Sequence, residues 1–118
     1  MASTSQKLLI NSALTAASTN GDPQSLPPRS RRFIGWINAS AVNAATTVTA
    51  VIQHSPDGTN WITLISFAAI VGVDSVEAVN ASSDHVFVNV RAVVTLAGVT
   101  KAATVKIQLW HDEDKCAN

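Results

Sequence analysis

Three histidines are the first candidates for chemistry in this chain of 118 residues, because imidazole can serve as a metal ligand or as an acid–base group. His54 ends a predicted strand beside a turn, His85 opens another strand, and His111 follows the last strand. No two of them have a spacing that places both on one face of a single element. A catalytic zinc site needs three protein ligands, so the sequence predicts no metal site.

The C-terminal segment 111–116, His-Asp-Glu-Asp-Lys-Cys, offers further carboxylate, imidazole and thiol groups. It lies beyond the last predicted strand, and we expect a solvated tail there. Serine and threonine are abundant, but none lies in a nucleophile motif such as Gly-x-Ser-x-Gly. The chain also has no glycine-rich loop for phosphate. The sequence therefore predicts a protein that is not an enzyme and that binds no cofactor.

Two short clusters of opposite charge stand out in a chain that is otherwise poor in charge. The basic cluster could contact phosphate, although loop arginines more often form salt bridges or stay solvated. The acidic cluster is its electrostatic complement, so we expect the two to pair across a subunit boundary. The first cluster consists of Arg29, Arg31 and Arg32, and the second of Asp112, Glu113 and Asp114.

The three tryptophans suggest a second kind of chemistry, the stacking of sugar rings on aromatic faces. Trp110 lies on the polar side of its predicted strand, which favours such a platform together with Trp36. Trp61 directly follows a turn, and we expect it to cap one end of the core. Tyrosine is absent from the chain. Carbohydrate binding is therefore an alternative to a purely structural role.

The elements that position these residues are clearest between Thr46 and Phe67. A run rich in β-branched residues enters Ser-Pro-Asp-Gly and leaves through Thr-Asn-Trp into a second apolar run. Pro56 presets φ for the first central position of a type I turn, Asp57 suits the second, and Gly58 can adopt the left-handed conformation of a bulged hairpin. The predicted structural turn consists of Ser55, Pro56, Asp57, Gly58 and Trp61.

Alternation of apolar and polar residues predicts further strands at 33–38, 85–94 and 104–109, with an edge strand at 74–80. Six to eight short strands joined by turn signals predict an all-β fold. We expect a single antiparallel β-sandwich of the jelly-roll or immunoglobulin type, with extended N- and C-terminal tails.

The predicted organisation is an N-terminal arm and loop at 1–32, a sandwich core at 33–110 and a C-terminal tail at 111–118. A first strand is possible at 7–17, with Leu8, Ile10 and Leu14 on one side, and a helix is the alternative there. Both ends of the chain are too polar to become ordered by themselves. We expect a neighbouring subunit to hold them.

Composition narrows the function. The apolar fraction is 47%, the formal net charge is zero and only 14% of residues are charged, against about 25% in a typical soluble domain. A surface so poor in charge favours packing against neighbours, with composition bias as the alternative. The neutral balance argues against nucleic-acid binding, and no apolar run approaches the ~20 residues that span a bilayer. The single Cys116 cannot form an internal disulfide, which fits a reducing cytoplasm.

One family resemblance rests on segment 51–61, Val-Ile-Gln-His-Ser-Pro-Asp-Gly-Thr-Asn-Trp, and on the strand pair 88–94 and 103–107. These segments resemble small β-sandwich virion proteins of tailed bacteriophages, in which a strand ending in Gln-x-Ser-x-Asp-Gly leads to a tryptophan. Similar turns occur in carbohydrate-binding sandwiches. The resemblance implies that the turn residues and Arg91 are framework residues.

The same resemblance implies a virion structural protein, foremost a head decoration (cement) protein that is made and assembled in the host cytoplasm. Its implied partners are the major capsid protein and copies of itself, with a trimer as the expected form. No direct contact with nucleic acid or a membrane is expected. The alternatives are a tail or neck component and an adhesin-like module that binds glycans.

Overall fold

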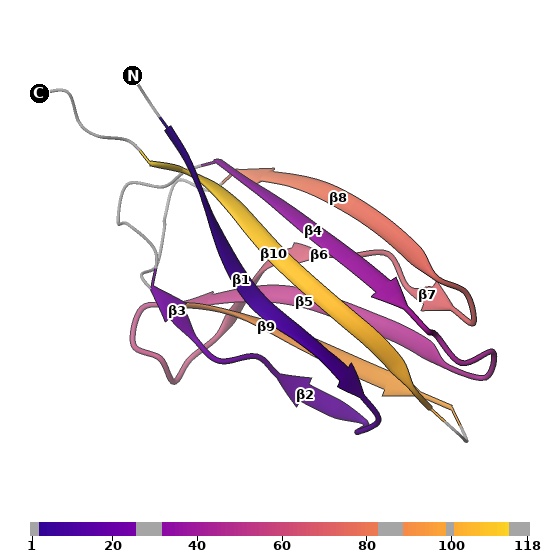
Figure 1. Cartoon of the computed structure of the whole chain (residues 1–118). Coiled ribbons are helices and arrows are strands. Elements are labelled where there is room, and N and C mark those ends of the chain that lie inside the picture. Colours follow the sequence, from indigo (N-terminus) through magenta and orange to yellow (C-terminus); the bar gives the residue numbers. More distant parts are fainter. Residues whose placement is uncertain (1–2, 26–31, 83–88, 99–100, 114–118) are drawn as a thin grey trace, which may run out of the picture.

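The computed structural model describes residues 3–25, 32–82, 89–98 and 101–113 of the chain. In these ranges the regular elements are all strands, and they form two antiparallel sheets that pack face to face (Figure 1). The all-β sandwich that the alternating pattern predicted is therefore confirmed. Ten strands are present in the described part of the chain, more than expected, because three of them are only two or three residues long.

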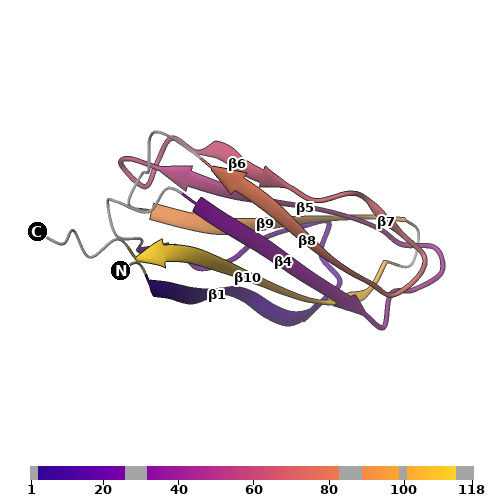
Figure 2. The ribbon, with the colours of Figure 1, turned by 90° about the horizontal axis from the view of Figure 1, so that it is seen from above.

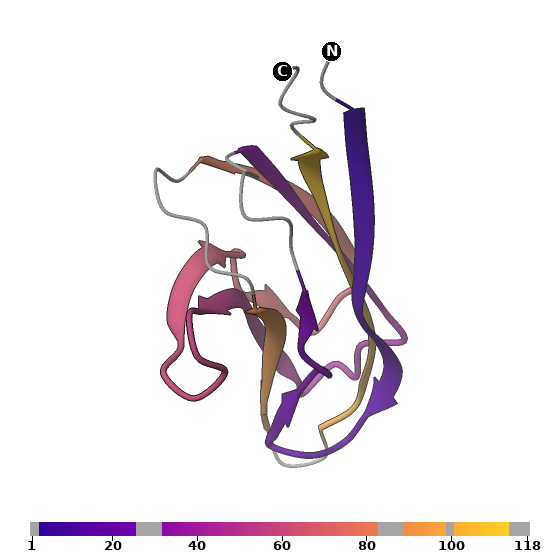
Figure 3. The ribbon, with the colours of Figure 1, turned by 90° about the vertical axis from the view of Figure 1, so that its left-hand side faces the viewer.

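Sheet I has four strands in the order β1-β10-β4-β8, which span Ser3–Leu14, Ala103–Glu113, Arg32–Ser40 and Ser75–Ser82. Sheet II is built on the order β2-β9-β5-β6, with spans Ser18–Asn20, Asn89–Ala97, Thr47–Ser55 and Ile62–Ser66. Two short strands complete it: β3 (Gln24–Ser25) pairs with β9, and β7 (Ile70–Val71) pairs with β5. Figure 3 shows the two layers from one end.

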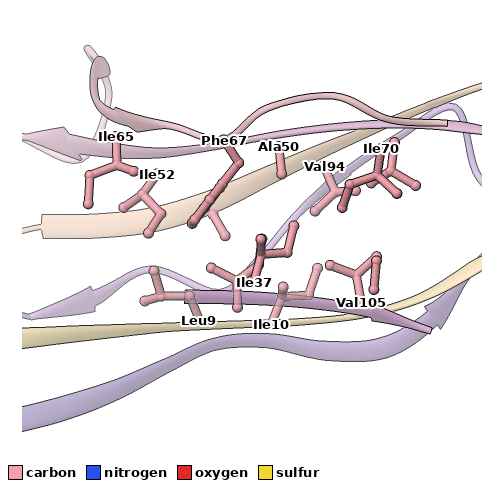
Figure 4. Close-up of a cluster of buried hydrophobic side chains, with 14 of the residues drawn as sticks. Leu9, Ile10, Ile37, Ala50, Ile52, Ile65, Phe67, Ile70, Val94 and Val105 are labelled. Carbon is pink, nitrogen blue, oxygen red and sulfur yellow. The ribbon is translucent and has the colours of Figure 1, made fainter. Parts of the chain in front are cut away.

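Strict alternation decides which side chains enter the core. In β4, for example, Phe33, Gly35 and Ile37 are buried while Ile34 and Trp36 lie on the outer face, because successive side chains of a strand point to opposite sides. Apolar side chains of the two sheets meet between the layers (Figure 4). The largest fully buried apolar residues are Phe33, Ile37, Val48, Ile52, Ile65, Val90, Val94, Val105, Ile107 and Leu109.

Gly35 makes room for this core. A Cβ at this position would lie 3.0 Å from Ile65 Cδ1 and from Phe67 Cζ, and 3.2 Å from Ile52 Cδ1. Ile52 and Ile65 belong to sheet II and Phe67 directly follows β6, so the glycine lets side chains from the opposite layer approach the backbone of β4. Gly35 shares the buried side of β4 with Phe33 and Ile37, and its missing side chain is part of the packing.

The segment expected as an N-terminal arm and loop at 1–32 contributes three strands to the sandwich in its described residues, and the possible first strand at 7–17 is present as β1 instead of a helix. β1 runs the length of β10, from Ser3 opposite Glu113 to Leu14 opposite Ala103. The polar residues before Lys7 were expected to need a neighbouring subunit, but β10 of the same chain supplies the backbone hydrogen-bond partners. The core therefore extends beyond the expected limits of 33–110.

β1 also differs from the prediction in which residues it buries. The register shifts between Leu8 and Ile10, which is a β-bulge. As a result Leu9 and Ile10 are both buried, and Leu8, which was expected on the core side, is 45% exposed. A bulge shifts the alternation of inward and outward side chains by one residue. A pattern with strict period 2 therefore assigns the residues on one side of the bulge to the wrong face of the sheet.

The C-terminal tail expected at 111–118 is corrected in the same way for its first three residues. β10 continues to Glu113, and His111 is only 2% exposed, paired in register with Ser5 and with Phe33. Residues 114–118 lie outside the described part. Seen from above, β1 and β8 form the two edges of sheet I, with β8 on the side of β6 (Figure 2). The edge strand predicted at 74–80 is thus β8.

Candidate functional site

The loop between β5 and β6 holds the five residues of the predicted turn. His54 pairs with Ile62, so the loop spans 55–61 and is wider than a two-residue hairpin. Gly58 has a φ of +78°, in the left-handed region. The bulge lies within the strand pair, where the step from Ile52 to Gln53 on β5 corresponds to two residues on β6.

Asp57 organises this loop. Its Oδ1 accepts hydrogen bonds from the backbone N–H groups of Thr59 and Asn60, both at 2.8 Å, and from the Ser55 hydroxyl at 3.0 Å. Its Oδ2 accepts one from Asn60 Nδ2 at 2.8 Å. These donors, the two backbone N–H groups foremost, hold the pKa of Asp57 well below its ordinary value. A carboxylate so committed to its own loop is a structural group.

Trp61 does not cap the core, which corrects the expectation for it. Its ring is partly exposed, and the guanidinium carbon of Arg91 lies 4.2 Å from the ring centroid. Arg91 alternates with the buried Val90 and Ala92, so this cation–π pair lies on the outer face of sheet II. Arg91 Nε also donates a hydrogen bond to Gln53 Oε1 at 3.0 Å. The contacts of Arg91 with Trp61 and Gln53 therefore link β9 to β5 and to the loop.

The two histidines that the structure describes, His54 and His111, lie in different sheets. His54 is 6% exposed at the end of β5, and burial lowers the pKa of its imidazole. His111 is buried in sheet I near the end of β10, and His85 lies outside the described residues. Among the residues that the structure describes, no three His, Cys, Asp or Glu side chains are grouped so that they could hold a metal ion.

The described members of the two charged clusters lie at one end of sheet I. Phe33 of β4 pairs with His111 of β10, so Arg32 and Asp112 lie at the same end of neighbouring strands of one chain. Their pairing across a subunit boundary stays a prediction, with an intrachain alternative at this end. Glu113 ends β10, whereas Arg29, Arg31 and Asp114 lie outside the described residues.

The outer face of sheet I carries two tryptophans in contact with each other. Trp36 of β4 and Trp110 of β10 are partly exposed and form an edge-to-face pair, with ring centroids 6.4 Å apart and planes at 88°. Lys106 Nζ lies 5.9 Å from the centroid of Trp36. Two exposed apolar neighbours extend this face, Ile34 (44% exposed) on β4 and Leu8 on β1.

A groove borders this face at the open side of the sandwich, between β1 and the β2–β3 segment. Its volume is about 350 Å³, and its lining consists of residues 8–12 and of Thr19, Asn20, Gly21, Asp22 and Gln24. Asp22 is the one carboxylate in this lining, so the groove has no set of hard ligands for a cation.

Sequence reasoning identified the tryptophans but missed their surroundings. Lys106, Gln108 and Trp110 alternate with core residues of β10, and this pattern puts all three on the polar side of one strand. Which residues of β1, β4 and β8 lie beside them depends on strand order, and that order is not sequential in this fold. The described part of the chain contains no helix that could cross a membrane.

No protein-family model and no curated protein matches this chain. Its fold is similar to a chain in the structure of infectious bursal disease virus, Gx strain, with a TM-score of 0.66 at 12% identity. The match covers 99% of this chain and 33% of the viral chain, so this chain spans a third of that chain's length. The crystal structure of FLHE matches over 95% of both chains, at 17% identity and a TM-score of 0.39. The viral likeness establishes a shared β-sandwich fold.

Proposed function

We propose that this protein is a non-enzymatic structural subunit of a virus particle, and more specifically a capsid decoration protein of a tailed bacteriophage. The supporting observation is the likeness of its fold, over 99% of the chain, to a chain of a virus structure. In this proposal the protein binds the major capsid protein and copies of itself, with a trimer as the expected form. It stabilises the head because the bound state is favoured over the dissociated one.

A patch of exposed valines supports association through apolar contacts. Val71, Val73 and Val76 are 63%, 63% and 61% exposed, and they lie within six residues of one another in β7, the following turn and β8. We call them the valine patch. Removing such side chains from water contributes about 25 cal/mol per Å² of apolar area buried. In a chain with so few charges, this patch is a suitable subunit contact.

Two hydrogen bonds fix the segment that carries the patch. Asp74 Oδ1 accepts from the backbone N–H of Val42 at 3.1 Å, and Glu77 Oε1 accepts from the backbone N–H of Ala68 at 2.9 Å. The valines therefore project from a segment that is already anchored on both sides. A preorganised contact loses less conformational entropy on binding than a mobile one.

The test measures assembly and particle binding with the same variants. The purified wild-type protein is expected to form a discrete oligomer by light scattering and to co-sediment with phage heads that lack it. Val71→Lys/Val76→Lys should weaken both, because each lysine places a charge in the contact. Thr95→Lys, on the exposed outer side of β9, is the control that adds a charge elsewhere. A wild-type protein that stays monomeric and does not sediment with heads contradicts the proposal.

A location on the tail or neck is the alternative within the same class. A cryo-EM map of the particle with which the protein co-purifies distinguishes the two. Density for this sandwich at symmetry axes of the head supports decoration, whereas density confined to the tail or neck would replace it.

A further inference from the structure

We infer that the outer face of sheet I, together with the groove beside β1, binds a carbohydrate chain. This inference goes beyond a structural role in a particle and does not depend on it. It rests on which side chains the register places next to one another on this face.

The aromatic part of the face provides surfaces for sugar rings. Trp36 and Trp110 are both partly exposed, and Ile34 is paired with Trp110 across β4 and β10. The C–H faces of a pyranose are apolar and pack against aromatic rings. The indole N–H is a hydrogen-bond donor that a sugar hydroxyl can use.

Carboxamide side chains are interleaved with these apolar groups in a regular way. Each of four large apolar residues has an asparagine or glutamine directly opposite it on a neighbouring strand. A carboxamide both donates and accepts hydrogen bonds, which matches the chemistry of a hydroxyl group. The cross-strand pairs are Leu8 with Gln108, Trp36 with Gln108, Trp110 with Gln6, and Ile34 with Asn80. Gln108 is only 8% exposed, so Gln6 and Asn80 are the accessible amides.

This arrangement favours a glycan over a second copy of the chain. The interiors of protein–protein contacts concentrate apolar side chains and exclude polar ones, whereas here the apolar groups alternate with amides.

The groove extends the face beyond the tryptophans. Leu8 and Asn11 of β1 belong to the outer face by their pairing with Gln108 and Lys106, and they also line the groove. Asn20 and Gln24 add two further amides on its other side. A chain of several sugar units that stacks on the tryptophans can therefore continue over β1 into a polar channel. An extended oligosaccharide or polysaccharide suits this surface better than a single sugar.

The experiment is affinity electrophoresis in native gels that contain hydroxyethylcellulose, dextran, alginate or purified bacterial lipopolysaccharide. The wild-type protein is expected to be retarded by at least one of these probes. Trp36→Ala and Trp110→Ala should each weaken the interaction roughly tenfold or more, a change of about 1.4 kcal/mol in binding free energy. Trp61→Ala is the matched control, because Trp61 lies on the outer face of sheet II and should leave the retardation unchanged.

A second variant separates binding from folding. Gln6 and Asn80 are exposed at the rim of the face, so Gln6→Ala/Asn80→Ala should keep the wild-type melting temperature and still reduce retardation. No retardation of the wild type by any of the four probes overturns the inference. So does retardation that Trp36→Ala and Trp110→Ala do not change. Loss of particle binding in Trp36→Ala, with no retardation of the wild type, would identify a protein contact instead. If the tryptophan variants lose retardation but still bind particles, glycan binding and particle binding use different surfaces.

Discussion

Asp57 shows how a residue that suggests chemistry can be committed to structure. Its carboxylate accepts hydrogen bonds from three residues of its own loop, and these bonds lower its pKa. In the unfolded chain the Asp57 carboxyl has an ordinary pKa of about 3.9. The stabilisation from its hydrogen bonds is therefore fully present above that pH. It is lost as the pH falls toward the lower pKa of the folded state.

Asp57→Asn should therefore lower the melting temperature at pH 7, and the difference from wild type should shrink as the pH falls below about 4. Circular dichroism melts between pH 2 and 7 measure this. Asp22→Asn removes a carboxylate from an exposed loop of sheet II and serves as the control for net charge. A difference that is the same at every pH would mean that the Asp57 carboxylate does not stabilise the loop.

His54 gives a pH dependence of the same sign at a higher pH, because burial lowers the pKa of its imidazole by disfavouring the charged form. Below about pH 6.5 the unfolded state takes up a proton more readily than the folded state. Stability should therefore be constant above this pH and decline as the pH falls through it.

The His54→Gln variant removes this group, and its melting temperature should fall less between pH 7.5 and 5 than that of the wild type. An NMR titration of the imidazole gives the pKa directly. A value at or above about 6.5 would contradict the role that burial has here.

At the scale of elements, the approach of sheet II to β4 depends on Gly35. Gly35→Ala would place a Cβ 3.0 Å from Ile65 Cδ1 and Phe67 Cζ. These are the far ends of side chains, so they can shift at a cost. We expect destabilisation of about 1–3 kcal/mol, measured by denaturant unfolding.

The double variant Gly35→Ala/Ile65→Val supplies the control, because it removes one of the crowded atoms. It should be more stable than the sum of the two single changes predicts. Strict additivity would show that Ile65 is not the group that Gly35 accommodates.

Strand order is the element-scale property that sequence patterns did not supply. Alternation identified the inward residues of β4, β5, β9 and β10, because one buried face per strand imposes a period of two. It misassigned Leu8, where the bulge in β1 breaks the period. It left open whether 7–17 is a strand or a helix and missed the polar beginning of β1 at 3–6, because the partners that hold this strand are backbone groups about a hundred residues away.

At the scale of the whole molecule, the low charge predicts how assembly responds to salt. The proposed contacts are apolar and the chain has a formal net charge of zero. Raising sodium chloride from about 0.05 to 0.5 M, which shortens the Debye length severalfold, should leave the oligomer mass unchanged in light scattering. Dissociation at high salt would instead indicate that the charged clusters hold the subunits together.

By itself, the sequence determined the fold class, the inward faces of the central strands and the position of the β5–β6 turn. Those properties are local, since they depend on alternation and on the φ preferences of proline and glycine. The tertiary structure decided that β1 and the end of β10 belong to the sandwich, that Trp61 lies outside the core beside Arg91, and that Trp36 and Trp110 share one face with a row of amides. These follow from which strands are neighbours, and non-sequential strand pairing leaves no local signal in the chain.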